Sequence, residues 1–241
     1  MRLRPSLLAL LALATLPLWT TCGGSGDANL FTNPSFEEGE EPWISLTTEA
    51  WGTPFHVADA VAHAGKHSAA LEMRAMAEAG TKVFGVVQEV QPDEFPELVS
   101  GYYRVGQWTR GTTVQYIQFV VIAIGSTNAP GAPTPFPNHQ IRYLLAGTDQ
   151  EPFAISNAKF VFVGTAEPAP DDWVYFERNI RQDFIDQWGA APEGFSSIRM
   201  LFEVRYDSKD AGNTKPEADV FFDDLYMGPA AENPNAPGGQ E

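Results

Sequence analysis

Hydrophobic and polar residues alternate along much of this chain with a period of two, the period of a β-strand. In segment 198–206, one set of alternate positions is apolar and the other carries Arg199, Glu203 and Arg205. This pattern predicts a strand with one buried face and one wet face. Segment 114–121 is largely apolar at both sets of positions, which predicts a strand at the centre of a sheet. Eight segments bounded by Gly, Pro, Asn or Asp are predicted as strands: 68–73, 82–91, 98–105, 112–124, 159–163, 174–181, 197–206 and 218–227.

Few segments are predicted to be helix, long loop or disordered tail. Residues 182–189 are predicted to form one or two helical turns, and no long amphipathic helix is evident. Residues 125–138 are rich in proline and predict a long surface loop, either a lid or contact arm or a tolerated insertion. Residues 229–241 have no apolar pattern and are predicted to be disordered or extended. The strands together predict one all-β domain over residues 29–228, built as a sandwich.

Composition supports a globular protein and narrows its partners. The chain has 241 residues, of which 44% are hydrophobic and 12% aromatic, enough for a substantial core. Its formal net charge is −16, which opposes the phosphates of nucleic acids, so we expect no nucleic-acid partner. A single cysteine excludes an internal disulfide framework and a cysteine-rich zinc site.

The amino terminus has the pattern of an export signal. Two arginines precede an uncharged run over residues 7–19, which is shorter than the ~20 residues of a membrane span and contains Pro17. This predicts a signal peptide over residues 1–21. Cys22 and the glycines after it resemble the lipobox of bacterial lipoproteins, which implies a lipid on Cys22, a short linker over 22–28 and a periplasmic or cell-surface location. Ordinary signal cleavage, an uncleaved anchor and a buried cysteine stay open as alternatives.

Five short motifs follow one another in the remaining chain. They are NLFTNPSFEEG with a later Trp, AGKHSAAL, VVQEV, VSGYYR and VFFDDL, at residues 29–43, 64–71, 86–90, 99–104 and 220–225. In this order they resemble carbohydrate-binding modules of the family 4, 9 and 22 type. The resemblance implies a galactose-binding-like jelly-roll β-sandwich and a glycan ligand. Its pattern is lost between residues 125 and 167.

The two ends of the domain are expected to meet. The first and last strands of a jelly roll lie side by side, which would bring Glu37 or Glu38 near Asp223 or Asp224. The resembling modules hold a structural calcium at this corner, and the resemblance implies Glu37, Asp223 and backbone groups around Gly65 and His67 as its ligands. Calcium takes six to eight oxygen ligands. In the alternative interpretation these acids are solvated or paired with Lys66.

Sugar binding combines flat aromatic side chains with polar groups that bond hydroxyls. Any single aromatic residue could instead belong to the core, since a sandwich of this size needs many large side chains. The predicted ligand-binding residues on a concave face, with tryptophans arriving from loops, are Trp51, Gln88, Tyr102, Arg104, Trp108, Gln118, Glu203 and Arg205.

Catalysis has little support in the sequence. The four histidines show no HExxH spacing, and the chain contains no nucleophile elbow, P-loop or dinucleotide-binding fingerprint. The sequence therefore favours a non-catalytic, exported, lipid-anchored domain that recognises a glycan. The alternative is a structural or accessory subunit of an extracytoplasmic membrane-associated complex, in which the jelly roll is a platform for a protein partner.

Overall fold

A computed structural model describes residues 28–46, 52–74, 80–111, 114–128, 138–148, 153–155, 157–165, 167–208 and 215–237. The predicted signal peptide, Cys22, Trp51 and most of the proline-rich loop lie outside these residues. Among the helices within them, none is long and apolar enough to cross a membrane.

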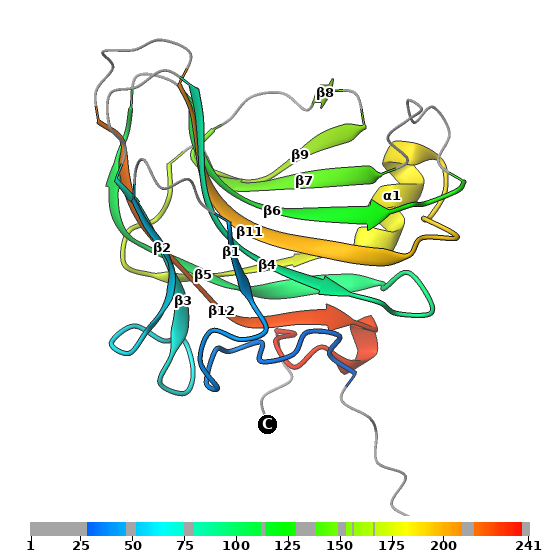
Figure 1. Cartoon of the computed structure of the whole chain (residues 1–241), viewed down its shortest axis with the longest axis horizontal. Helices are drawn as coiled ribbons and strands as arrows, with labels where there is room; N and C mark the ends of the chain where they lie inside the picture. The colour runs from blue at the N-terminus through cyan, green and yellow to red at the C-terminus, as the bar shows by residue number, and fades with distance from the viewer. Residues whose placement is uncertain are drawn as a thin grey trace, which may run out of the picture.

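Two β-sheets pack face to face, as Figure 1 shows. The larger sheet has seven strands in the order β1-β4-β11-β6-β7-β9-β8, and the smaller has five in the order β10-β5-β12-β3-β2. Every pairing in them is antiparallel except that of β7 with β9. The predicted jelly-roll β-sandwich is therefore confirmed. The strands are β1 (Ile44–Leu46), β2 (Gly52–Ala58), β3 (Ser68–Arg74), β4 (Gly80–Val90), β5 (Leu98–Thr109), β6 (Val114–Ile124), β7 (His139–Ala146), β8 (Phe153–Ile155), β9 (Ala158–Thr165), β10 (Trp173–Arg178), β11 (Ser197–Ser208) and β12 (Glu217–Gly228).

All eight predicted strands occur, and four further strands were missed. Strands β1 and β8 have three residues each, too few for a periodic pattern. Strand β2 begins directly after Trp51 and contains Pro54. Strand β7 begins directly after the proline-rich loop, whose composition hid the pattern that follows it.

Aromatic side chains fill the space between the sheets. Phe202 on β11 is fully buried, and its ring centroid lies 6.2 Å from that of Phe119 on β6 and 5.3 Å from that of Phe222 on β12. The same core is closed at one end by helix α1 (Ile180–Trp188), visible at the right of Figure 1. Asn179 caps this helix and Gly189 ends it in the left-handed conformation, which confirms the predicted helical segment.

The amino-terminal segment runs along the last strand, as predicted. The backbone N–H of Leu30 donates to Met227 O at 2.8 Å, and that of Leu225 donates to Pro34 O at 3.0 Å. These bonds place the first turns of the domain against β12.

The carboxyl-terminal tail, predicted to be disordered or extended, makes defined contacts with the sandwich over residues 229–235. Residues Ala230–Glu232 form a 3-10 helix, and Asn233 after them is 8% exposed. The Asn233 side chain donates to Tyr175 Oη at 3.1 Å, and that of Asn235 donates to Asp224 O at 2.6 Å. Side-chain amides rather than apolar residues hold this segment, so a hydrophobic pattern could not predict its order.

Candidate functional site

The outer face of the seven-stranded sheet carries the polar residues of β11. Met200, Phe202 and Val204 of this strand belong to the core, so the alternate positions, including Glu203 and Arg205, face away from it. Glu203 lies opposite Gln118 of β6 in the strand register. Charged residues at the centre of a strand on this side contribute nothing to core packing, which makes the face a candidate for ligand contact.

Glu203 and Gln118 form the floor of this face. Glu203 is 3% exposed and Gln118 is fully buried, and Gln118 Nε2 donates to Glu203 Oε2 at 2.5 Å. Gln118 Oε1 has no hydrogen-bond partner within the described part of the chain. A buried acceptor without a donor costs about 1–3 kcal/mol, so an arriving hydroxyl group would be favoured here.

Two arginines flank the floor. Arg205 lies opposite Tyr116 on β6, and Arg142 of β7 lies between Val120 of β6 and Phe160 of β9 in the register. Both arginines are half-buried. The Arg142 guanidinium carbon lies 5.6 Å from the ring centroid of Phe160, a cation–π contact that holds it above the sheet.

Apolar side chains surround the polar floor. On the edge strand β1, Ile44 is 66% and Leu46 is 36% exposed. A Cβ atom added to Gly85 would lie 3.0 Å from Glu203 Cγ and 3.6 Å from Leu46 Cβ, so all three positions share the outer face. A second cluster on the same sheet contains Tyr116, Leu144, Ala158 and Phe160, packed against Val114 and Phe162.

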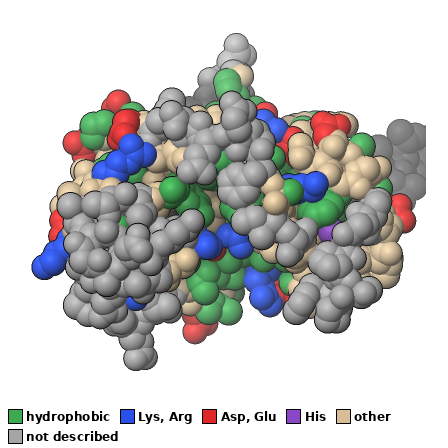
Figure 2. Space-filling model, turned by 90° about the horizontal axis from the view of Figure 1, so that it is seen from above, with side chains coloured by type: hydrophobic (Ala, Val, Ile, Leu, Met, Phe, Trp, Pro, Cys, Tyr) green, Lys and Arg blue, Asp and Glu red, His purple; other side chains and the backbone are tan. Residues whose placement is uncertain are grey.

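The charge of the protein is unevenly distributed. On the side of the molecule seen in Figure 2, Lys and Arg side chains lie beside hydrophobic ones near the middle, while acidic side chains lie mainly toward the margin. The formal charge of −16 therefore does not describe every part of the surface.

The prediction of one common ligand face is wrong. Gln118, Glu203 and Arg205 share the outer face just described, but Gln88 and Trp108 do not. Gln88 is buried and bonds the backbone of the amino-terminal segment, accepting from Thr32 N and donating to Thr32 O at 2.9 Å each. Trp108 packs against the core cluster.

Tyr102 and Arg104 lie on the outer face of the other sheet. They share one face of β5, as alternation predicted, but their polar and aromatic groups already have partners in the chain. The ring of Tyr102 stacks on His63 with centroids 3.6 Å apart. The Arg104 guanidinium donates to the carboxylate of Asp171 at 2.9 Å.

The predicted calcium corner is held by backbone N–H groups. Glu37 Oε1 accepts from the N–H groups of Lys66 and His67 at 2.7 and 2.8 Å, which lowers the pKa of Glu37. Asp223 Oδ2 accepts from the N–H groups of His63 and Ala64 at 2.7 and 3.4 Å. Calcium requires oxygen ligands, and the loop turns donors toward both carboxylates. Within the described ranges no group of three or more His, Cys, Asp or Glu side chains is arranged to hold a metal. The calcium site implied by the family resemblance, which includes backbone groups, stays a prediction.

Gly65 makes the contact with Glu37 possible. Its φ of +68° is in the left-handed region, and an added Cβ would lie 2.3 Å from Glu37 Oε1. His67 also faces Glu37, with 3.4 Å between Nδ1 and Oε2. The residues implied by the resemblance are therefore neighbours, as expected, although their donors and acceptors pair with one another.

Asp223 is an unusual carboxyl group. It is fully buried, and burial, followed by repulsion from the neighbouring Asp224, raises its pKa to about 7. Asp224 has a left-handed backbone with φ of +48° and bonds His63 Nδ1 at 2.6 Å. This strained pair occurs where the pairing of β12 with β5 is irregular, and it fixes the loop before β3.

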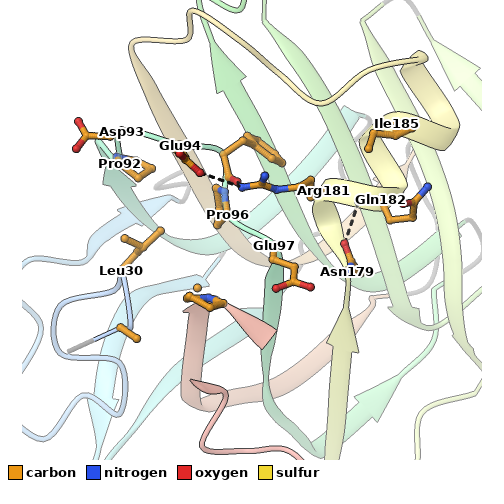
Figure 3. Close-up of a pocket in the computed structure, with 14 residues that line it drawn as sticks. Leu30, Pro92, Asp93, Glu94, Pro96, Glu97, Asn179, Arg181, Gln182 and Ile185 are labelled. Atoms are coloured by element: carbon orange, nitrogen blue, oxygen red, sulfur yellow. Dashed lines mark hydrogen bonds and ion pairs between the residues drawn. The ribbon is translucent and has the colours of Figure 1, made fainter. Parts of the chain in front are cut away.

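A cavity of about 790 Å³ lies beside helix α1, as Figure 3 shows. Its polar groups serve the fold: Arg181 donates to Phe95 O, Asn179 caps the helix, and Glu97 accepts from Ala230 N at 2.9 Å. The cavity is therefore a weaker candidate for ligand binding than the outer face of the seven-stranded sheet.

Sequence reasoning missed Arg142, Leu46 and Phe160. Arg142 was missed with its strand, although the alternation of Ile141 and Tyr143 with polar neighbours contained the signal. Leu46 lies in a strand too short to show a pattern. Phe160 is in a predicted strand, but the face on which it lies could not be assigned without the pairing of β7 with β9.

Comparison with known proteins finds β-sandwich neighbours. No family model matches the chain, and no curated protein matches it. Among solved structures, TmCBM61 in complex with β-1,4-galactotriose is 14% identical, with 83% of this chain and 97% of that chain covered and a TM-score of 0.42. The family 11 carbohydrate-binding module from Clostridium thermocellum, in complex with a mixed-linked tetrasaccharide, is 11% identical, with 84% and 95% covered and a TM-score of 0.40. These structural neighbours are carbohydrate-binding modules, and the likeness is weak.

Proposed function

We propose that this protein is a non-catalytic glycan-binding module whose ligand lies across the outer face of the seven-stranded sheet. The observation that carries the proposal is the polar floor of Gln118 and Glu203, which lies at the centre of a face turned away from the core. Gln118 Oε1 offers a hydrogen-bond acceptor, and the exposed aliphatic side chains of β1 offer an apolar surface. Sugars present both hydroxyl groups and apolar C–H faces, so this combination suits them.

The sequence also supports a location for such a module. The pattern of residues 1–22 supports export and attachment to a membrane through a lipid on Cys22. The ordered motifs support a relationship to modules of the family 4, 9 and 22 type. We place the protein in the periplasm or on the cell surface on these grounds.

The alternative is an accessory subunit that binds a protein partner. The exposure of Ile44 at 66% on an edge strand favours this alternative, because an exposed apolar edge can pair with another chain. Such a partner would cover β1 and would not require the polar floor of Gln118 and Glu203.

A paired substitution tests the proposed function. Replacing Gln118 by Leu together with Glu203 by Met removes both partners at once, so neither is left buried and unsatisfied and the fold should be kept. Affinity for the glycan selected from an array should fall about tenfold or more, because buried polar groups carry specificity for hydroxyls. Arg104→Gln on the other sheet is the matched control and should leave the affinity unchanged.

A second variant covers the case in which the paired substitution unfolds the protein. Leu46→Asp lies on the exposed edge of the same face, and it should weaken glycan binding while the melting temperature changes little. Glycan binding that is unaffected by both changes would contradict the proposed site.

A further inference from the structure

The cavity beside helix α1 has apolar walls on both sides. Leu30 lines it from the amino-terminal segment and Ile185 lines it from the helix, as Figure 3 shows. Its volume of about 790 Å³ is within the range of ~300–1,000 Å³ that is typical of ligand pockets. Pro92, Pro96 and Pro229 also line it, and their rings fix the φ angles of the backbone there. The cavity is therefore apolar in part and is formed before any ligand arrives.

Ile185 carries this apolar wall onto the surface of the helix. Its side chain is 39% exposed, whereas Ile180, Phe184 and Trp188 of the same helix are buried in the core. Single exposed hydrophobic residues are common, but one that also lines a cavity adds apolar area where a ligand would enter. The outward side of α1 therefore favours a ligand with an apolar part.

Carboxylates outnumber cations around the cavity. Its lining includes the three carboxylates of Asp93, Glu94 and Glu97 and one guanidinium group, that of Arg181. Arg181 donates to Phe95 O, and its Nη2 lies 3.9 Å from Glu94 Oε2 on a side chain that is 88% exposed. The exposed carboxylate of Asp93 has no hydrogen-bond or ion-pair partner in the part of the chain that the structure describes. This negative charge is open to solvent and favours a cationic ligand.

The carboxylates do not converge on one point. In Figure 3 the carboxylate of Glu94 lies beside Arg181, and that of Asp93 points away from it. Among the described residues, no three His, Cys, Asp or Glu side chains are grouped to hold a metal ion. Carboxylates that lie apart are contacted by an extended ligand and not by a single ion.

We propose that this cavity binds a basic peptide segment of a protein partner. A lysine or arginine side chain of the segment pairs with Asp93 and Glu94, and a neighbouring aliphatic side chain packs on Ile185. Burial of the aliphatic side chain supplies affinity, and the charged hydrogen bonds fix the position of the segment. The net charge of −16 speeds the arrival of a basic segment. The cavity shares no residue with the proposed glycan site, so this interaction goes beyond glycan recognition.

The test compares basic peptides with their neutral counterparts. The full chain is titrated with pentapeptide amides in which lysine or arginine alternates with leucine or isoleucine. The same peptides are then used with acetylated lysine, or with citrulline in place of arginine. At least one basic peptide should bind about tenfold or more tightly than its neutral counterpart, as measured by isothermal titration.

Two pairs of variants locate the charged contact. Asp93→Lys together with Glu94→Lys should weaken binding of that peptide about tenfold or more, because attraction becomes repulsion. The matched control is Glu40→Lys together with Glu232→Lys, which changes the net charge equally at exposed positions outside the cavity. Its effect should be much smaller.

A second comparison tests the apolar contact without changing charge. Ile185→Asn should weaken binding of the peptide about fivefold or more, because the aliphatic side chain loses the surface on which it packs. Ile44→Asn, at an exposed position on β1, is its control and should leave the affinity unchanged. All of these positions are exposed, so the fold should be kept in every variant.

The possible failures are distinguishable. Equal binding of basic and neutral peptides, or equal losses in the cavity variants and their controls, would overturn the inference. Binding of spermine as tight as that of the peptides would show attraction to any polycation and would also overturn it. The absence of binding by every peptide would do the same. Each of these results leaves the glycan-binding function standing, because the glycan array tests that function separately.

Discussion

The outer faces of the two sheets carry similar types of residue, but these residues have different partners within the chain. On the five-stranded sheet, Arg104 pairs with Asp171 and Tyr102 stacks on His63. The tail also covers this sheet, where Asn233 donates to Tyr175. On the seven-stranded sheet, the described polar groups of Gln118 and Glu203 pair across neighbouring strands, and no described terminus covers them. Residue type therefore does not distinguish a structural face from a candidate binding face. The distinction is whether loops and termini bond the polar groups of that face.

The largest expected difference between the faces is in ligand affinity. The double variant Gln118→Leu/Glu203→Met should lose about tenfold or more in affinity for the glycan selected from an array, as measured by isothermal titration. Arg104→Gln should bind as the original protein does. Comparable losses in both variants would remove the distinction between the faces.

The second prediction concerns the pH dependence of the five-stranded face. The pKa of Asp223 is raised to about 7, above the ~3.9 of an unfolded Asp, so the folded state binds more protons between these values. Its contribution to stability is complete below about pH 4 and is lost as the pH rises through 7. Relative to Asp223→Asn, the unfolding free energy of the original protein should fall by on the order of 2 kcal/mol between pH 4 and 8.

Urea unfolding at several pH values measures this difference. Since other groups titrate in both proteins, only the difference between them reports on Asp223. Parallel pH profiles for the two proteins would show that Asp223 is an ordinary carboxylate.

The third prediction concerns the tail. Asn233→Ala removes hydrogen bonds to Tyr175 and Glu177 and takes away the acceptor of the Ser100 hydroxyl, since Ser100 Oγ donates to Asn233 Oδ1 at 2.9 Å. The unfolding free energy should fall by about 1–2 kcal/mol. Glycan affinity should be unchanged, and a loss of affinity would mean that the tail supports the binding face.

The smallest expected effect is that of calcium. Because backbone N–H groups already occupy the carboxylates of Glu37 and Asp223, removing calcium with a chelator should shift the melting temperature by less than about 1 °C. A rise of several degrees on adding calcium to chelated protein would restore the calcium site implied by the family resemblance.

Local patterns predicted the elements better than the site. Period-two alternation predicted eight segments that are strands in the structure, and it placed Glu203 and Arg205 on the outward side of β11. It could not say that β5 and β11 belong to different sheets, because strand pairing is set by contacts between distant segments. Tyr102 and Arg205 were therefore grouped together although they lie on opposite sides of the sandwich. Gln88 was misassigned because its partner, Thr32, lies 56 residues away.

The measurement that tests the binding face most directly is nuclear magnetic resonance of side-chain nitrogens during titration with the glycan selected from an array. The resonance of the Gln118 side-chain amide should shift in proportion to the bound fraction, while that of the Arg104 Nε–H should stay in place. Shifts confined to Arg104 and the five-stranded sheet would contradict the account.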